Sequence, residues 1–254
     1  MRIQVLLFFI VVGARSAGAD FVISPYASQN FSSASAPFFV DTNYATSVRY
    51  QQVYGGSDFA RRGSPQYLIT EIQFSPGPDS GPIDIVLPNV EINLSTTPRS
   101  VDSLSPVFGS NVGLDNTLVY SGQLHMIARA DGIHILLQRP FLYAWSAGNL
   151  LMDVRNYQTV RITPPPPLGP PLLMGVSTLG DTVSLASAFD VSSATATFLG
   201  TGGLLTAFTV TGVPEPGSAW LLLVGLGALV LLKWRSRTRV HTNCRLIKTP
   251  RGGH

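Results

Sequence analysis

Two histidines, His125 and His134, are the clearest candidates for metal binding or acid–base chemistry. They lie on either side of Asp131-Gly132, a dipeptide that favours a two-residue β-hairpin turn. If this turn pairs Ala130 with Ile133, both imidazoles lie on one face, about four residues apart along the strands. At ~3.3 Å per residue this separation is ~13 Å, which is too far for one metal ion to bind both. We therefore interpret them as exposed strand histidines, and the sequence predicts no metal site and no cofactor.

Carboxylates are the second set of candidates, because glycoside hydrolysis requires two of them across the scissile bond. The possible members are Glu71, Glu91, Asp58 and Asp153, but nothing in their spacing selects a pair. Glu91 falls on the polar side of its predicted strand, which favours a solvated surface. Acids in predicted turns leave open a single weak Ca²⁺ site; they are Asp79, Asp115 with Asn116, and Asp131. We predict that the chain is not an enzyme, with a glycan-active hydrolase as the alternative.

Other reactive groups give little support for catalysis. The chain has no Gly-x-Ser-x-Gly sequence, and the glycines near position 200 lack the lysine of a phosphate-binding loop. The single cysteine, Cys244, follows the last apolar run, so the preceding region has no thiol nucleophile. Four aromatic residues could stack on sugar rings or could belong to a core: Tyr50, Tyr54, Tyr143 and Trp145. They leave a lectin-like carbohydrate-binding module as a further alternative.

Short segments in which apolar and polar residues alternate must position these side chains. This alternation is typical of half-buried β-strands. The alternating positions on one face of three such segments are Val90, Ile92 and Leu94; Leu150, Met152 and Val154; and Leu204, Thr206, Phe208 and Val210, all apolar except Thr206. Residues 124–138 are predicted to form a hairpin with one apolar face, and residues 200–203 mark a second hairpin.

The spacing of these strands predicts an all-β exported domain over residues 20–212, with a β-sandwich or jelly-roll-like architecture. Turn-rich breaks fall at residues 55–58, 75–82 and 146–149. The Pro-rich segment 164–171 must be extended. It could link two domains, but we interpret it as a loop within one, because the 38 residues from 175 to 212 are too few to bury a separate core.

Charge separates this domain from the two ends of the chain. Residues 20–212 contain eight arginines, no lysine and 13 aspartates and glutamates, which gives a net charge of −5, although the whole chain has +3. The basic residues at the two ends therefore account for the high isoelectric point. The acidic domain gives no support for binding to nucleic acid.

The N-terminus has the pattern of a secretory signal peptide over residues 1–19. Arg2 precedes an apolar run at residues 5–12, and Ala17 and Ala19 supply the small-x-small pattern that signal peptidase accepts. Cleavage there would make Asp20 the first mature residue. The alternative is a buried N-terminal strand.

A membrane-spanning helix is predicted near the C-terminus, at about residues 218–234. Its uninterrupted apolar run, residues 219–232, would extend ~21 Å as a helix, against a hydrocarbon core of ~30 Å. Length alone is therefore weak evidence. Trp220 and Trp234 can lie at the two interfaces. The basic residues that follow would stop transfer and keep that end in the cytoplasm; they are Lys233, Arg235, Arg237 and Arg239.

Directly before this helix, Pro214, Glu215 and Pro216 form a stiff, extended segment, because each proline fixes its own φ and restricts the preceding residue. The order Val-Pro-Glu-Pro, apolar helix and arginine cluster, over residues 213–239, resembles the PEP-CTERM sorting tail. The resemblance implies that an exosortase recognises Pro214, Glu215 and Pro216. An ordinary anchor with a Pro-rich stem is the alternative. Such tails usually end soon after the arginines, whereas this chain has a basic extension at residues 240–254.

These features together predict an exported protein, and the resemblance implies that its source is a Gram-negative bacterium. It would pass the inner membrane, remain anchored there as a precursor, and then reach the cell surface or the extracellular matrix. Because the resemblance implies a bacterium that makes exopolysaccharide, we predict a structural or adhesive role associated with exopolysaccharide or biofilm.

Overall fold

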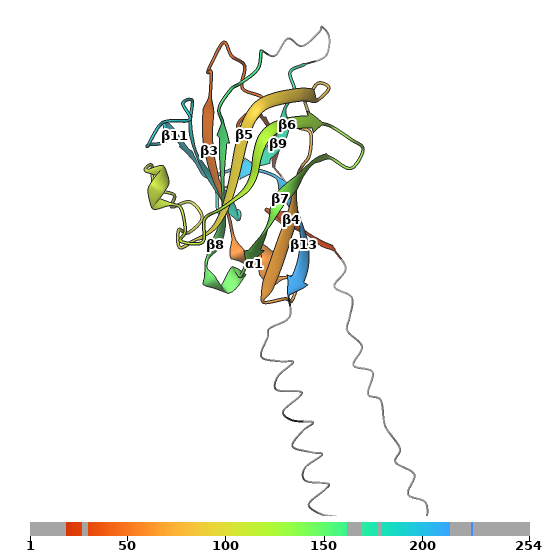
Figure 1. Cartoon of the computed structure of the whole chain (residues 1–254), viewed down its shortest axis with the longest axis vertical. Coiled ribbons are helices and arrows are strands. Elements are labelled where there is room, and N and C mark those ends of the chain that lie inside the picture. Colours follow the sequence, from red (N-terminus) through yellow and green to blue (C-terminus); the bar gives the residue numbers. More distant parts are fainter. Residues whose placement is uncertain (1–18, 27–29, 162–168, 177–178, 214–224, 226–254) are drawn as a thin grey trace, which may run out of the picture. The chain divides into compact units, whose positions relative to one another are not determined.

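The computed structural model describes residues 19–26, 30–161, 169–176, 179–213 and 225, and within them the fold is all-β (Figure 1). This confirms the predicted fold class; the narrower sandwich or jelly-roll assignment stays a prediction. The strands are β1 (Asp20–Ser24), β2 (Phe31–Ala34), β3 (Val48–Tyr54), β4 (Gln66–Phe74), β5 (Asp84–Thr97), β6 (Thr117–Ile127), β7 (Ile133–Tyr143), β8 (Asn149–Asn156), β9 (Leu173–Val176), β10 (Val183–Ala188), β11 (Phe198–Gly200), β12 (Gly203–Leu204) and β13 (Thr206–Val213). Three short helices interrupt them: α1 (Gly56–Ala60), η1 (Phe108–Ser110) and η2 (Trp145–Ala147).

The strands form three antiparallel sheets. A four-stranded sheet has the order β1-β13-β4-β7, a six-stranded sheet has the order β11-β10-β3-β8-β5-β6, and a three-stranded sheet has the order β12-β9-β2. Side chains from all three sheets meet in one hydrophobic cluster. Aromatic rings dominate its centre, where Phe59 contacts both Tyr143 and Phe208.

Alternation correctly predicted the core-facing positions. Val90, Ile92 and Leu94 of β5 are fully buried, and so are the four alternating positions named for β13 and the residues before it: Leu204, Thr206, Phe208 and Val210. The half-buried interpretation is wrong for β8, because Leu151 and Asp153 on its other face are also buried. The connection between β5 and β6, residues 98–116, covers that face and forms a second apolar cluster.

Both predicted hairpins need correction. The turn between β6 and β7 has Ala130 and Asp131 at its centre, since the backbones of Arg129 and Gly132 hydrogen-bond to each other, one residue earlier than predicted. The two strands then separate: β6 pairs with β5, whereas β7 pairs with β4. The second predicted hairpin also joins two sheets, because β11 pairs with β10 and β12 pairs with β9.

The segment that follows the Pro-rich stretch contributes to every sheet. Residues 162–168 lie outside the described residues, but β9, β10 and β13 beyond them pair with β2, β3 and β4. By residue contacts the chain divides into two units, Met1–Val213 and Pro214–His254. All thirteen strands described here lie in the first.

Candidate functional site

The outer face of the four-stranded sheet gathers polar side chains from strands that are distant in sequence. Across this face, β-ladder register places Ala207, Gln73 and His134 in one row, and Thr209, Glu71 and Leu136 in the next. Alternation explains the arrangement, since the intervening residues of β4, β7 and β13 face the core. A β-bulge between Ile69 and Glu71 shifts the register of β4 against β7, so that Glu71 pairs with Leu136.

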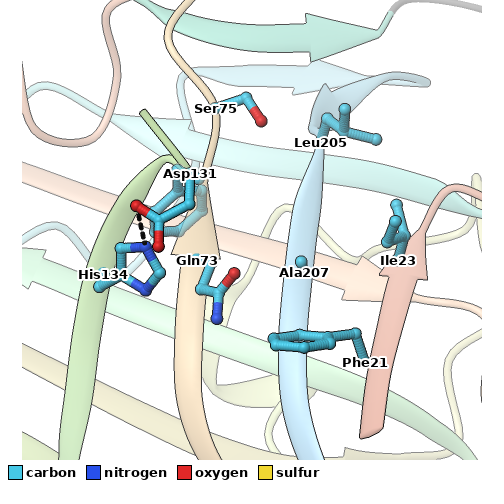
Figure 2. A pocket seen from close by; sticks show the side chains of 9 residues that line it. Phe21, Ile23, Gln73, Ser75, Asp131, His134, Leu205 and Ala207 are labelled. Carbon is cyan, nitrogen blue, oxygen red and sulfur yellow. Dashed lines mark ion pairs between the residues drawn. The ribbon is translucent and has the colours of Figure 1, made fainter. Parts of the chain in front are cut away.

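His134 lies between two carboxylates. Its Nδ1 atom is 2.7 Å from Glu71 Oε1. Its Nε2 atom is 3.2 Å from Asp131 Oδ1, and Figure 2 shows this second contact. The first contact is a well-formed hydrogen bond, whereas the geometry of the second supports an ion pair but no aligned hydrogen bond. Glu71 also accepts hydrogen bonds from Thr209 Oγ1 at 2.7 Å and Gln73 Nε2 at 3.1 Å. The cluster therefore joins β4, β7, β13 and the β6–β7 turn.

These contacts favour the charged forms of both main partners. Partial burial alone would lower the pKa of His134, but the contacts with Glu71 and Asp131 outweigh it and raise the pKa above its usual value of 6.5. Burial would raise the pKa of Glu71, but hydrogen bonds from Thr209, His134 and Gln73 lower it below its usual value of 4.5. Both shifts favour an imidazolium held by carboxylates over a neutral pair.

The second candidate histidine has a different carboxylate partner. His125 Nε2 lies 2.7 Å from Asp84 Oδ1, and both side chains are exposed. His125 and His134 do line one surface depression of about 520 Å³. Over the described ranges, however, no group of three or more His, Cys, Asp or Glu side chains could hold a metal ion.

The cluster is poorly arranged for glycoside hydrolysis. The imidazole of His134 occupies the space between Glu71 and Asp131, where a hydrolase must admit a sugar and, in an inverting enzyme, water. A neighbouring depression of about 420 Å³ is lined by His134 and Asp131 on one side and by Phe21 and Ile23 on the other (Figure 2).

The other predicted acids are held apart from one another by different partners. Asp58 is buried and accepts hydrogen bonds from the hydroxyls of Ser24 and Thr182. Glu91 accepts one from Tyr157 at 2.7 Å. The turn acids that suggested a Ca²⁺ site also have separate partners: Asp79 contacts Ser33, Asp115 accepts from the Thr96 backbone, and Asp131 contacts His134.

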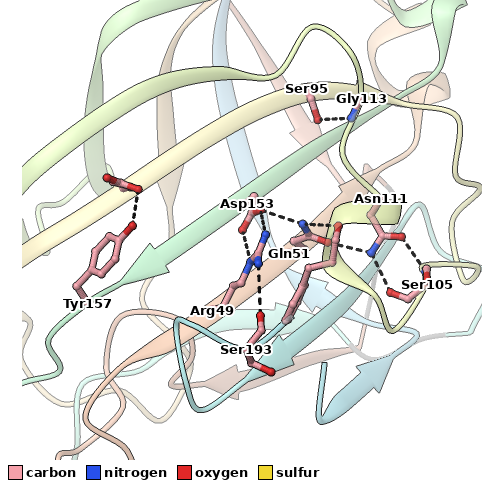
Figure 3. Close-up of polar contacts among 11 residues, drawn as sticks. Arg49, Gln51, Ser95, Ser105, Asn111, Gly113, Asp153, Tyr157 and Ser193 are labelled. Atoms are coloured by element: carbon pink, nitrogen blue, oxygen red, sulfur yellow. Dashed lines mark hydrogen bonds and ion pairs between the residues drawn. The ribbon is translucent and has the colours of Figure 1, made fainter. Parts of the chain in front are cut away.

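Asp153 belongs to a buried polar network that the sequence did not reveal (Figure 3). Arg49 donates to both its oxygens, at 2.9 and 3.4 Å, and Gln51 Nε2 donates to Oδ2 at 2.9 Å. Asn111 in turn donates to Gln51 and to the backbone of Ser105. This network fixes the 98–116 connection on β3 and β8. The only indication in the sequence was that Asp153 is a charged residue with apolar neighbours on its predicted strand.

The aromatic candidates for sugar stacking do not form an exposed platform. Tyr50, Tyr54 and Tyr143 are buried in the core. Trp145 is partly buried and donates its indole N–H to the backbone oxygen of Ser64 at 2.8 Å. A carbohydrate site would need a different surface.

The predicted sorting residues lie outside the described residues: Pro214, Glu215, Pro216, Lys233, Arg235, Arg237 and Arg239. The same holds for Ala17 and for the helix predicted at about 218–234, apart from Gly225. Ala19 is described as exposed, and β1 begins at the next residue. None of the helices in the described part of the chain is long and apolar enough to cross a membrane.

An all-β domain followed by a Pro-Glu-Pro segment, an apolar run and an arginine cluster defines an exported protein that carries its own sorting signal. Comparison with protein families agrees, since the model of the PEP-CTERM protein-sorting motif matches residues 212–237. The chain therefore carries a PEP-CTERM sorting motif over these residues. The match includes Lys233, Arg235 and Arg237 and ends before Arg239. No match was found among curated proteins.

The motif implies export, a membrane-anchored precursor, and processing by an exosortase for display at the cell surface. The motif therefore bears on the location of the all-β domain. The activity of that domain has to be inferred from the domain itself.

Proposed function

We propose that this protein is a non-enzymatic, structural or adhesive component of the envelope or extracellular matrix of a Gram-negative bacterium, associated with exopolysaccharide. The observation that carries the proposal is the sorting motif, whose match begins at residue 212, at the end of the last described strand, β13. The motif delivers the acidic all-β domain to a surface where it can contact polymers and other cells.

The state of the acidic side chains supports a non-enzymatic role over the hydrolase alternative. Glu71 is held by three side-chain partners, Asp153 by Arg49 and Gln51, and Asp58 by two hydroxyls. Carboxylates held in this way position strands and loops. They are not paired across a cleft in which a sugar could bind.

The sorting step is tested by Glu215→Ala in a strain that contains an exosortase. Loss of the carboxylate should block processing and leave the full-length form in the inner membrane, as judged by fractionation and apparent mass. Glu91→Ala, which removes a glutamate from a strand surface, should be processed normally. Unchanged size and location of the Glu215 variant would refute recognition through this residue.

The matrix role is tested by deleting the gene and restoring it. We expect the wild-type protein to co-extract with the exopolysaccharide fraction, and the deletion to weaken biofilm in a static assay. Restoration with Glu215→Ala should not recover the biofilm. A protein absent from that fraction and without effect on biofilm would contradict the matrix role, and release of reducing sugars by the wild-type protein would contradict the non-enzymatic one.

A further inference from the structure

A groove of about 720 Å³ lies at the end of the six-stranded sheet formed by β10 and β11. One wall is the core-facing side of these strands, on which Tyr50, Ser187 and Phe198 stand in register across β3, β10 and β11. The other wall comes from β2 and β9 of the three-stranded sheet. Tyr50 already belongs to the main core, so the groove is the open margin of that core.

The groove exposes large apolar groups to water. Phe189 and Phe198 line it and are 58% and 56% exposed. They follow the alternation of β10 and β11, because Ser187 pairs with Phe198 and Phe189 lies two residues beyond Ser187. Clustered aromatic side chains on a core-facing surface typically mark a site where another molecule binds.

Serine hydroxyls supply the polar part of the lining. Ser32 and Ser35 on one wall and Ser187 on the other have no side-chain hydrogen-bond partner among the described residues, whereas Ser33 contacts Asp79. Hydroxyls that line a groove and have no protein partner are available to hydrogen-bond a ligand. Small residues keep the space open, since Gly175 and Gly200 also line it.

The charge of the lining decides the class of ligand. None of the groove-lining residues is Asp, Glu, Lys, Arg or His. The domain elsewhere carries a net negative charge, which repels polyanions. The groove offers exposed aromatic rings and free hydroxyls but no ionic groups. A matching ligand must therefore present apolar C–H faces beside hydroxyls of its own. The pyranose rings of a neutral polysaccharide have this chemistry.

An added peptide strand fits less well, although β2 and β11 are edge strands that could accept one. β2 has four residues and β11 has three. Such short edges offer few ladder hydrogen bonds, which are the main source of affinity in strand addition.

We propose that the groove between β2 and β11 binds a neutral polysaccharide chain, with Phe189 and Phe198 stacking on sugar rings and Ser32, Ser35 and Ser187 hydrogen-bonding their hydroxyls. The proposal rests on the matrix function proposed above and names the surface that contacts the polymer. Of the four aromatic residues that the sequence left open as sugar-stacking candidates, only Tyr50 lines this groove, and it is buried.

The test is affinity electrophoresis of the full-length chain, purified in detergent, in gels that contain amylose, dextran, galactomannan or soluble β-glucan. At least one of these neutral polymers should retard the wild-type chain. Phe189→Ala with Phe198→Ala should weaken that retardation about tenfold or more, because the double replacement removes both stacking rings. Phe21→Ala, which removes a comparably exposed ring from the four-stranded sheet, is the matched control and should bind as wild type.

The outcomes separate this proposal from the sorting and matrix proposals. Binding that survives the double replacement, or retardation by none of the neutral polymers, would overturn the groove assignment while leaving processing at Glu215 intact. Stronger retardation by the polyanion alginate than by every neutral polymer would also overturn it. Circular dichroism of the double variant checks that the fold is retained, which is expected because both rings are more than half exposed.

Discussion

Each of the two large sheets carries an ion pair between a carboxylate and a basic side chain. The pair on the six-stranded sheet is enclosed by protein, whereas the pair on the four-stranded sheet borders water. Asp153 and Arg49 lie under the 98–116 connection, with their side chains 5% and 11% exposed. Glu71 and His134 lie on the open face of the four-stranded sheet and are 20% and 22% exposed, next to Asp131, which is 73% exposed. Similar contact distances therefore occur in very different dielectric surroundings.

This difference teaches that distance alone does not set what an ion pair contributes. The Asp153–Arg49 pair has lost most of its water, so each charge depends on its partner and on Gln51. The guanidinium also lies 4.5 Å above the Phe108 ring, which adds a cation–π contact from the covering connection. Glu71, His134 and Asp131 form the more exposed cluster, called the exposed cluster below. Water can reach these charges, so it screens them and can replace a lost partner at low cost.

The largest effect is expected from Asp153→Ala. It leaves the Arg49 charge buried without its partner, and the free energy of unfolding should fall by about 3–5 kcal/mol. Urea denaturation followed by tryptophan fluorescence measures the change. Asp84→Ala removes the exposed partner of His125 and should cost less than about 1 kcal/mol. Equal losses in the two variants would show that burial does not distinguish the pairs.

Asn111→Ala tests whether the covering connection depends on the same network. The change leaves Gln51 Oε1 and the Ser105 backbone N–H without partners inside the protein. We expect a loss of about 1–3 kcal/mol and faster amide hydrogen exchange across residues 98–116. Asn116→Ala, at an exposed position in the same connection, is the control and should change neither measurement.

A smaller effect is expected at the turn that positions the exposed cluster. Gly132 has φ +121°, and a Cβ there would lie 2.9 Å from the Phe74 backbone oxygen, so Gly132→Ala should cost about 1–2 kcal/mol. Gly63→Ala is the control, because Gly63 has φ +79° but open space around it. A loss no greater than that of the control would mean that the contact with Phe74 relaxes without cost.

The buried and exposed pairs also differ in how far the sequence could predict them. Alternation identified the inward residues of β5 and β13, because one face of each strand meets the core along its length. It could not show that β8 is covered on both faces, since the cover comes from a connection whose path depends on tertiary contacts such as Asn111 with Gln51. The Arg49–Asp153 pair joins residues 104 positions apart, a pairing that no local pattern encodes.

The exposed cluster was predicted only in part. Asp131-Gly132 correctly indicated a turn, but the turn centre lies one residue earlier, and the two strands join different sheets. His134 therefore meets Glu71 of β4, a neighbour set by sheet order. The sorting tail was predicted more fully, because an extended recognition segment, an apolar run and basic residues are adjacent in sequence and need no tertiary contacts to be identified.

The smallest effect, and the sharpest contrast with Asp153, is the pH dependence of the exposed cluster. Because the pKa of His134 is raised in the folded state, its contribution is complete below its usual pKa of 6.5 and is lost as pH rises through the raised value. Because the pKa of Glu71 is lowered, its contribution is present above 4.5 and is lost as pH falls through the lowered value. The cluster should therefore stabilise the fold most between about pH 4.5 and 6.5, by about 1 kcal/mol or less.

His134→Gln should flatten the decline in unfolding free energy above pH 6.5, measured by urea denaturation at a series of pH values. His125→Gln, at the more exposed histidine, is the control and should retain most of that decline. A variant lacking His134 with the wild-type pH profile would show that water screens the open face so well that its ion pairs contribute nothing measurable. In that case the buried pair of the six-stranded sheet would be the only one of the two that stabilises the domain through its charges.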